Sequence, residues 1–319
     1  MYWRQSAICI RHPNCEELSI MSNAYKKIFK SRSMRLKILK FLRFIPDKAM
    51  LKLEYRIKVR KPLNLNDPQT LNEKLQWLKL YNRKNIQTTM VDKIAVKDFV
   101  REKIGEKYVI PTYGAWERFD DIDFNALPEQ FVLKCNHDSG SIVICKDKSE
   151  LDLENAREVL TNGLTNNAYY YGREWPYLNV KPRIFAEQFI EDKEYEYLPV
   201  YKILCFNGEP KIIQTIQNDK QPDETVDYFD TDWNLLEFTQ EYPNSAQPFT
   251  KPEKLDEMLA LARKLSQEES FLRVDFYTVN GRVYFSEFTF FTDSGFGQFY
   301  PESWDTVLGQ WLTLPSAKQ

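Results

Sequence analysis

Charged side chains interrupt a segment near the end of the chain that otherwise has the composition of two half-buried strands, residues 271–291. Two carboxylates held close together repel each other at neutral pH unless a cation lies between them. Hard oxygen ligands on adjacent strands suit Mg²⁺, which commonly binds one or two carboxylates together with phosphate oxygens. The carboxylates are Asp275 and Glu287, accompanied by Arg273 and Thr289. A plainer alternative remains open, namely an Arg273–Glu287 ion pair with Asp275 exposed to solvent.

The turn between these strands decides which side chains meet, because the side chains of a strand alternate between its two faces. With a two-residue loop, Asn280-Gly281, Glu287 and Asp275 point to opposite sides. With a three-residue loop that includes Val279, and with glycine in the left-handed conformation, they share a face. We expect the three-residue loop because it separates charge from apolar surface. It places Arg273, Asp275, Glu287 and Thr289 on one face and Val274, Phe276, Tyr284 and Phe288 on the other.

Three other segments carry residues suited to a nucleotide. In QFVLKCNHDSGS, residues 130–141, Lys134 ends an apolar strand beside a small polar loop. Such a loop can offer backbone N–H groups to a phosphate, with the lysine as a point charge, although an ordinary hairpin fits equally. Lys93 lies near a helix start, where a surface lysine is the plain reading. Residues 184–192, IFAEQFIED, could present backbone groups and Glu187 to an adenine edge or form a plain strand.

The composition is that of a globular protein of 319 residues, long enough for two packed domains or one elaborated domain. The net charge of −2 predicts no nucleic-acid partner. Five scattered cysteines without a CxxC motif fit a reducing compartment and a cytoplasmic location. The chain has two histidines, His12 and His137, which excludes a His-rich zinc site and leaves a Ser–His–Asp hydrolase dependent on His137.

A basic segment from Lys26 to Phe44 is a local exception, with eight Lys or Arg residues and no acid. It is either a docking helix with a solvated basic face or a peripheral contact with the inner face of an anionic membrane. The opening residues lack a basic start followed by an apolar core, so we expect no signal peptide. No stretch has the apolar length of a transmembrane helix.

The order of the elements indicates an α+β fold with antiparallel sheets, because helices give way to hairpins and the chain ends in sheet. Residues 21–110 are mostly helical in pattern, and VYKILCFNGEPKIIQTIQ further on is a hairpin with Asn207-Gly208 at its turn. Helices are expected around 34–44, 70–82, 91–103, 150–163 and 252–268.

Together, the motifs resemble the ATP-grasp superfamily and, within it, the branch named for the teichuronopeptide biosynthesis protein TupA. They are Asp92-Lys93, VLK ending at Lys134, the small-residue loop, AEQFIE, YKILCFNGEPK and RVDF…YFSEFT. The resemblance implies two α+β lobes with antiparallel sheets that clasp ATP, preceded by a short helical region. The implied division is 1–85 for the basic helical region, 86–190 for the N-lobe with its phosphate loop, and 191–319 for the C-lobe with its magnesium-binding hairpin.

The resemblance also implies roles for individual residues. Lys93 and Lys134 match the two lysines that contact nucleotide phosphates, and residues 136–141 match the phosphate loop. Glu187 to Ile190 match the connection that holds adenine, and Glu194, with Glu191 as a rival, lies where the ribose-binding acid often falls. The implied cofactor-binding residues are Lys93, Lys134, His137, Ser139, Gly140, Ser141, Glu187, Gln188, Phe189, Ile190 and Glu194.

For the chemistry itself, the resemblance implies that Asp275 and Glu287 bind Mg²⁺, with Thr289 where many members have an Asn ligand. Arg273 matches a basic residue that stabilises the reacting carboxylate, and Lys202 matches a basic strand position that faces the phosphates or the acyl substrate. The sequence departs from the family pattern in this threonine, in a phosphate loop with a single glycine, and in a short helical N-terminal part in place of a Rossmann-like leading domain.

The implied activity is ATP-dependent ligation of a carboxylate to an amine. The γ-phosphoryl group of ATP passes to the carboxylate, and the amine displaces phosphate from the acyl phosphate to form an amide. The family's association with cell-surface polysaccharide gene clusters points to a hexuronic acid as donor and an amino acid or amino alcohol as amine. Residues 167–177 are a sugar-stacking surface or aromatic packing, and residues 291–298 supply oxyanion donors or form a plain surface loop.

Two other functions remain open. A metal-dependent glycosyltransferase would use Asp230-Thr231-Asp232, although the strand–helix alternation expected ahead of such a motif is missing. An inactive nucleotide-binding scaffold could be recruited to a membrane by the basic segment. The sequence leaves the oligomeric state open.

Overall fold

The structure, a computed structural model, describes residues 38–192, 198–218 and 223–316. The described residues up to Ile45 belong to one unit, and those from Pro46 onward belong to a second, larger unit. The described part of the first unit contains the 3-10 helix η1 (Leu42–Phe44), and the rings of Phe41 and Phe44 pack edge to face with centroids 6.2 Å apart. The membrane contact expected for residues 26–44 falls mostly outside the described residues, and no described helix is long and apolar enough to cross a membrane.

The larger unit begins with a run of helices, one of which starts at a clear sequence signal. Thr70 caps the second of them: its hydroxyl group accepts the N–H of Glu73, whose carboxylate accepts the N–H of Thr70. The expected helix at 70–82 is therefore confirmed. The expected helix at 91–103 starts later, because residues 92–95 form turns between two helices. The helices are α3 (Asp47–Lys58), α4 (Leu71–Tyr81), α5 (Asn85–Val91) and α6 (Val96–Ile104).

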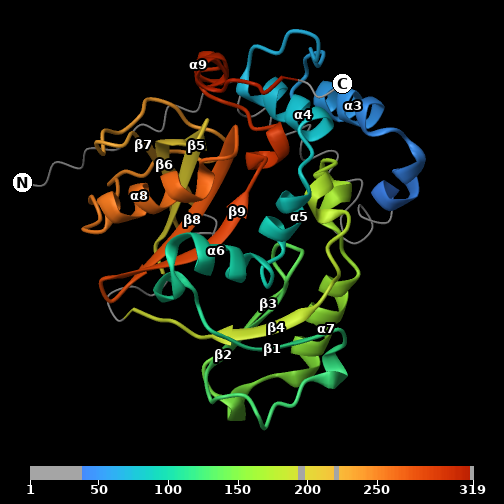
Figure 1. Ribbon diagram of the computed structural model, residues 1–319, viewed down its shortest axis with the longest axis vertical. Helices are drawn as coiled ribbons and strands as arrows, with labels where there is room; N and C mark the ends of the chain where they lie inside the picture. Colours follow the sequence, from blue (N-terminus) through green and yellow to red (C-terminus); the bar gives the residue numbers. More distant parts are fainter. Residues whose placement is uncertain (1–37, 193–197, 219–222, 317–319) are drawn as a thin grey trace, which may run out of the picture. The chain divides into compact units, whose positions relative to one another are not determined.

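A four-stranded antiparallel sheet follows, with the strand order β1-β4-β2-β3. One face packs against helix α7 (Leu153–Leu164), where Ala156 and Leu160 join Phe131 and Leu133 in a core (Figure 1). The other face carries Lys134. The strands are β1 (Thr112–Trp116), β2 (Phe131–Cys135), β3 (Ile142–Cys145) and β4 (Ile184–Gln188).

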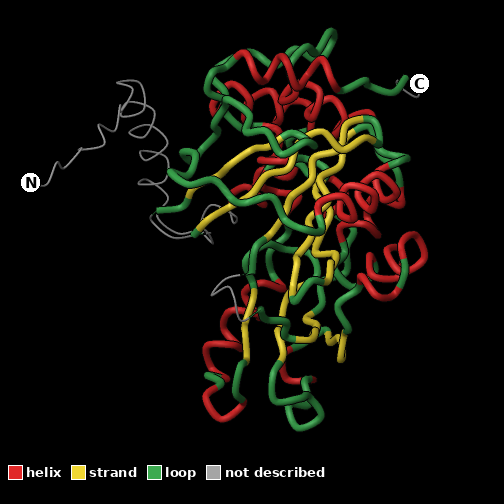
Figure 2. Tube along the Cα trace, turned by 90° about the vertical axis from the view of Figure 1, so that its left-hand side faces the viewer, coloured by secondary structure: helices red, strands yellow, loops and turns green. Residues whose placement is uncertain are grey.

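The second sheet has five antiparallel strands in the order β7-β6-β5-β8-β9. Helix α8 (Leu255–Ser266) packs against this sheet (Figure 1), and Met258 and Ala262 of its apolar side are buried in the core. In Figure 2 the helices, drawn in red, lie beside the yellow strands. The two antiparallel sheets with their helices confirm the α+β class. The strands are β5 (Val200–Phe206), β6 (Glu209–Gln217), β7 (Thr225–Phe229), β8 (Phe271–Val279) and β9 (Arg282–Thr289).

The core of the second sheet extends well beyond its own strands. Met90, Val91, Val96 and Val100 of α5 and α6 are buried in it, as is Leu308 of α9 (Ser303–Trp311). Helices from the N-terminal half of the chain therefore bring Lys93, which lies between them, to the β8–β9 hairpin. The division at residues 85 and 190 stays a prediction, and α5 and α6 share a core with strands on the C-terminal side of it.

The β8–β9 hairpin brings the expected side chains together by a different route. Val279 pairs with Arg282, so the loop has the two residues Asn280 and Gly281, both with positive φ (49° and 72°). The expectation of a three-residue loop is wrong. The parity is restored instead by a β-bulge, because Asp275 pairs with Glu287 while Phe276 pairs with Phe285.

The bulge also changes which side chains lie on the apolar face of this hairpin. Phe285, the partner of Phe276, is 5% exposed and belongs to the core, whereas Tyr284 pairs with Tyr277 on the polar side. The expectation that Tyr284 lies on the core face is therefore wrong. The shared face of the four polar residues is confirmed by the pairs Arg273–Thr289 and Asp275–Glu287.

Candidate active site

A row of polar side chains crosses the entire second sheet. Asp275 pairs with Glu287 on one side and with Lys202 on the other, and Lys202 pairs with Gln214. Gln214 in turn pairs with Tyr228 on the far edge strand. Direct cross-strand partners point to the same face, so Lys202 lies on the face of the sheet that carries the two acids; its expected role towards phosphates or the acyl substrate stays a prediction.

Arg273 binds Asp275 with two parallel hydrogen bonds. Its Nε and Nη2 atoms each donate to an Asp275 oxygen at 2.8 Å, and Nη2 lies 3.5 Å from Glu287 Oε1. Asp275 is 1% exposed, so the plain alternative in which it is solvated is wrong. Burial raises the pKa of Asp275, with Arg273 opposing the rise. Burial would lower the pKa of Arg273, yet Asp275 holds it above its usual range.

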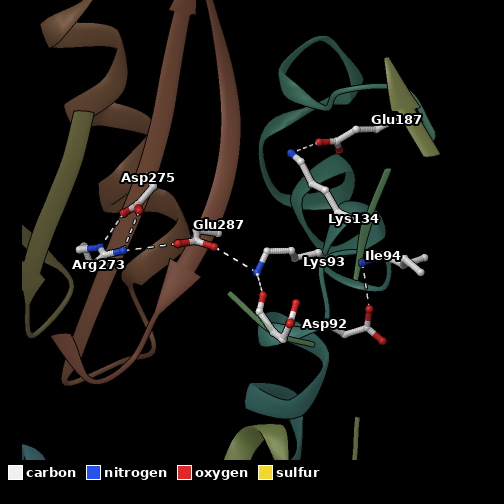
Figure 3. A network of polar contacts seen from close by, with 9 residues as sticks. Asp92, Lys93, Ile94, Lys134, Glu187, Arg273, Asp275 and Glu287 are labelled. Carbon is white, nitrogen blue, oxygen red and sulfur yellow. Dashed lines mark hydrogen bonds and ion pairs between the residues drawn. The ribbon is translucent and has the colours of Figure 1, made fainter. Parts of the chain in front are cut away.

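Lys93 connects the hairpin to the phosphate loop. Its ammonium lies 3.2 Å from Glu287 Oε2 and donates to the carbonyl of Asp138 at 3.1 Å (Figure 3). Asp92 fixes this lysine by accepting the N–H of Ile94 at 2.9 Å. Burial would raise the pKa of Glu287, but Lys93 and then Arg273 lower it to about 2. The two acids therefore face cations from both sides.

A second charge cluster lies on the first sheet. Glu187 of β4 forms an ion pair with Lys134 of β2 (Figure 3). Its other oxygen lies 3.0 Å from the ammonium of Lys97 on α6. Burial would raise the pKa of Glu187, but the two lysines lower it, and burial lowers the pKa of Lys97. Lys97 was not singled out in the sequence, although its position four residues after Lys93 is the spacing of one helix face.

The base of the loop at residues 136–141 is buried and tied down. The carbonyl of Asn136 accepts the N–H of Lys93 at 3.0 Å, and Ser141 Oγ donates to Asp138 at 2.5 Å. His137 is fully buried, bonded to the Asn136 side chain and to the carbonyl of Asn166, and burial lowers its pKa. Only the tip, Ser139 and Gly140, is exposed, and Gly140 has φ 102°. One glycine therefore suffices for the turn at the tip.

The segment expected at adenine continues from β4. The N–H of Gln188 donates to the carbonyl of Pro111 at 2.9 Å, and Phe189 lies under the ammonium of Lys146, 5.7 Å from its ring centre. Ile190 is half-buried. The Glu187 carboxylate is held by lysines, so it is not free to bind a base. Glu194 lies outside the described residues.

Two apolar side chains beside this segment were missed in the sequence. Ile142 and Ile144 of β3 are 42% and 57% exposed. Ile142 pairs with Lys134 and Ile144 with Val132, which pairs in turn with Glu187. They therefore lie on the face that carries the lysine. The sequence offers no alternation that marks them, because residues 142–145 are all apolar.

The aromatic segment at 167–177 is mainly packing. Tyr169 and Trp175 are each 8% exposed, and the Tyr169 hydroxyl donates to Asp47 at 2.6 Å. Tyr177 was missed: it lies within electrostatic range of Glu287 and Asp275, and burial raises its pKa well above the usual range. At the motif Asp230-Thr231-Asp232, Asp230 accepts the N–H groups of Asp232 and Asn234, so this carboxylate shapes a turn.

The donor set at the hairpin fits a magnesium ion shared with phosphate. In the described residues, no group of three or more His, Cys, Asp or Glu side chains could hold a metal alone. Asp275 and Glu287 pair directly, and their oxygens already face the positive charges of Arg273 and Lys93. A pair of acids that attracts positive charge and leaves coordination positions for other oxygens is what Mg²⁺ with phosphate uses. Thr289, opposite Arg273, would add a hydroxyl oxygen.

Comparisons with solved structures give distant likenesses to ligases. Among solved structures, D-alanine–D-alanine ligase from Bacillus anthracis with ATP is 17% identical, with a TM-score of 0.37, covering 63% of this chain and 53% of that one. The Helicobacter pylori D-alanine–D-alanine ligase is 14% identical, with a TM-score of 0.42 and coverage of 78% and 68%. The L-amino acid ligase from Bacillus licheniformis is 16% identical, with a TM-score of 0.39 and coverage of 77% and 53%.

These likenesses are distant, and the chain spans about half the length of the first of these structures. No curated protein matches the chain. The family model described as TupA-like ATPgrasp matches residues 73–313, which contain both sheets and both charge clusters. The chain therefore belongs to the TupA-like ATP-grasp family.

Proposed function

We propose that the protein is an ATP-dependent carboxylate–amine ligase. The observation that carries the proposal is the facing of the two charge clusters: Lys93 contacts both Glu287 of the hairpin and the carbonyl of Asp138 in the loop next to Lys134. Each acid in these clusters is matched by lysine or arginine. The phosphates of a bound triphosphate could take the place of the acids beside the lysines, and its metal ion could take the place of the lysine and the arginine beside the acids. No charge would then be left unbalanced.

In the proposed reaction, Lys93 and Lys134 bind phosphate oxygens, and the base lies on Ile142 and Ile144 beside residues 187–190. Lys202 faces the reacting groups from the middle of the second sheet, and Arg273 binds the acyl oxygen that becomes negative when the amine attacks and before phosphate leaves. The carboxylate attacks the γ-phosphorus and ADP leaves. The amine then attacks the acyl carbon, phosphate leaves, and the amine's proton is released. The residues contribute chiefly by positioning and charge neutralisation.

Asp275 and Glu287, with Thr289, would hold Mg²⁺. When bound, the ion would supply charge neutralisation for the phosphates.

The substrate class follows from the family. We propose a hexuronic acid, free or within a glycan, as donor and an amino acid or amino alcohol as acceptor, in cell-surface polysaccharide biosynthesis. The proposed location is the cytoplasm, with peripheral contact at the inner face of the membrane through the basic segment.

The test is to incubate the protein with Mg-ATP, a panel of uronic acids or UDP-uronates, and amines. Carboxylate-dependent release of ADP with formation of an amide supports the ligase. Release of UDP without ATP would establish the glycosyltransferase instead, and nucleotide binding without turnover would leave the scaffold. Asp232→Asn is the matched control for Asp275→Asn. It makes the same change of aspartate to asparagine, but in the turn at Asp230 and not on the β8–β9 hairpin. A ligase loses ADP release with Asp275→Asn and keeps it with Asp232→Asn.

A further inference from the structure

Lys79 of α4 is fully buried, yet none of the roles above uses it. Its ammonium donates to the carbonyl of Gly172 at 2.6 Å and to that of Ser294 at 2.7 Å. It also lies 5.4 Å from the ring centre of Phe291 and 4.9 Å from that of Phe296. Burying a charged lysine costs free energy unless its N–H donors are satisfied. These contacts therefore hold the segment from Phe291 to Phe296 in place.

Gln76 reaches the same segment from one turn earlier on α4. Its side-chain nitrogen donates to the carbonyls of Ser294 and Gly295 at 2.9 and 2.6 Å, and Gln76 is also fully buried. Ser294 is held a third time, because its hydroxyl group donates to Glu174. Lys79 and Gln76 thus bind the adjacent carbonyl groups of Ser294 and Gly295, and we call this set of contacts the grip.

The gripped segment has an unusual backbone. Asp293, Ser294 and Gly295 have φ values of 49°, 51° and 62°. Successive residues with side chains rarely adopt this left-handed conformation unless other contacts impose it. Gly172 allows the close approach, since a Cβ atom there would lie 2.8 Å from the Cβ of Ser294. The turn 293–295 is therefore built by its surroundings rather than by its own preference.

This turn borders the candidate active site. It begins four residues after Thr289, the end of the catalytic hairpin, and Asp293 lies within electrostatic range of Arg273 and Lys202. Lys79 and Gln76 are fully buried, whereas Asp293 is exposed. An exposed carboxylate beside the reacting centre attracts a positively charged group.

We propose that Lys79 and Gln76 are positioning residues that hold the turn 293–295, and that this turn presents Asp293 to the ammonium group of the acceptor amine. The inference rests on the proposed function, because the acceptor amine belongs to that reaction. It adds that the turn binds the acceptor as a cation, with α4 as the support, and that the ammonium group loses a proton to solvent before the neutral amine attacks the acyl carbon.

The chain provides a matched control on the same helix. Lys74 also donates to two carbonyls, those of Gly309 and Leu312, both at 2.7 Å, but these lie at the end of α9. Lys79→Met and Lys74→Met therefore each remove one ammonium from two carbonyl partners. The backbone N–H groups that are protected from hydrogen exchange differ between the two sites. Near Lys79 they are those of Ser294 and Phe296, which donate within the turn, and near Lys74 it is that of Leu312, which donates to Gly309.

Hydrogen exchange measured by mass spectrometry on the nucleotide-free protein tests the grip without relying on catalysis. We expect Lys79→Met to speed exchange at Ser294 and Phe296 by about tenfold or more, and Lys74→Met to speed it at Leu312 only. Equal exchange at the turn in Lys79→Met and wild type overturns the grip. Should Lys79→Met not fold, Gln76→Met removes the other donor to the Ser294 carbonyl and is judged in the same way.

Kinetics then test the acceptor. Asp293→Asn should raise the KM for the amine about tenfold, while the Kd of ATP measured by calorimetry stays unchanged. Lys79→Met should show the same split, and Lys74→Met should not. An unchanged amine KM in Asp293→Asn overturns the acceptor contact. If wild-type protein releases no carboxylate-dependent ADP, the proposed function fails, and the acceptor contact with it, whereas the exchange experiment still decides the grip.

Discussion

Lys93 binds Glu287 at 3.2 Å and holds the carbonyl of Asp138 at 3.1 Å with the same ammonium group. The lysine assigned to phosphate thus joins two segments, the loop of the first sheet and the hairpin of the second. A phosphate that binds Lys93 must compete with Glu287, and a metal ion on Glu287 must compete with Lys93. Nucleotide and metal ion are therefore expected to bind together more readily than either alone.

Lys93→Met should change how the free energy of unfolding depends on pH. The pKa of Glu287 is lowered from 4.5 to about 2 in the folded protein. A lowered carboxylate pKa stabilises the fold above the unfolded pKa, and this contribution is lost as pH falls from 4.5 towards 2. Without Lys93 the pKa of Glu287 rises, so the variant has less of this contribution to lose. Thermal unfolding should show a smaller drop between pH 6 and pH 3 in Lys93→Met than in wild type.

Lys93→Arg is the control, since it keeps the positive charge and should retain the wild-type slope. Parallel pH profiles for wild type and Lys93→Met would show that Lys93 does not set the titration of Glu287.

Glu187→Ala should be strongly destabilising. Its carboxylate joins Lys134 and Lys97, whose side chains are only 19% and 12% exposed. Removing the acid leaves two ammonium groups without their partner away from water, which typically costs about 3–5 kcal/mol. Urea unfolding measures this loss. Glu117→Ala removes a carboxylate from an ion pair that is largely exposed, with Lys181, and should leave the unfolding midpoint unchanged.

Local signals in the sequence were sufficient for most of the fold. Thr70 and Glu73 mark the start of α4 by their own chemistry, and Asn207-Gly208 marks the turn between β5 and β6. The β-bulge opposite Asp275 leaves no such signal, because any residue can occupy it and its position is set by packing on both faces. A wrong loop length and an unseen bulge compensated each other in the prediction of which residues share a face.

The site was predictable where the residues are close in sequence. Arg273 and Asp275 are two residues apart on one strand, so their shared face follows from strand geometry. The contact of Lys93 with Glu287 joins residues that are far apart in the chain, and only the packing of α5 and α6 into the second core produces it. Asp293 was missed for a related reason, since its exposure depends on side chains of α4.

Ile144→Asn should weaken ATP binding without weakening the fold. Ile144 is 57% exposed on the face of the first sheet that also carries Lys134 and Glu187. Placing an aromatic base on this side chain would bury it, so a polar replacement should raise the Kd of ATP about tenfold. Leu153→Asn is the control, because Leu153 is 46% exposed at the start of α7. Equal ATP affinity in both variants would show that β3 does not contact the base.

Gly309→Ala should destabilise the contact between α9 and the start of α4. A Cβ atom at this position would lie 2.1 Å from the carbonyl oxygen of Gln69 and 2.8 Å from backbone atoms of Thr70. Backbone atoms cannot move aside as a flexible side chain can, so α9 must shift. That shift also strains the buried hydrogen bonds from Asn72 to Asp305, at 3.0 and 2.9 Å. We expect a loss of about 1–3 kcal/mol in urea unfolding.

Gln310→Ala is the control for this prediction, because Gln310 is exposed on the same helix and alanine favours helix. It should change the free energy of unfolding by less than about 0.5 kcal/mol. If both variants unfold at the same urea concentration, α9 can move away from Thr70 at little cost. The carbonyls of Gly309 and Leu312 would then not be a firm anchor for Lys74, and the exchange control on α4 would need a different lysine.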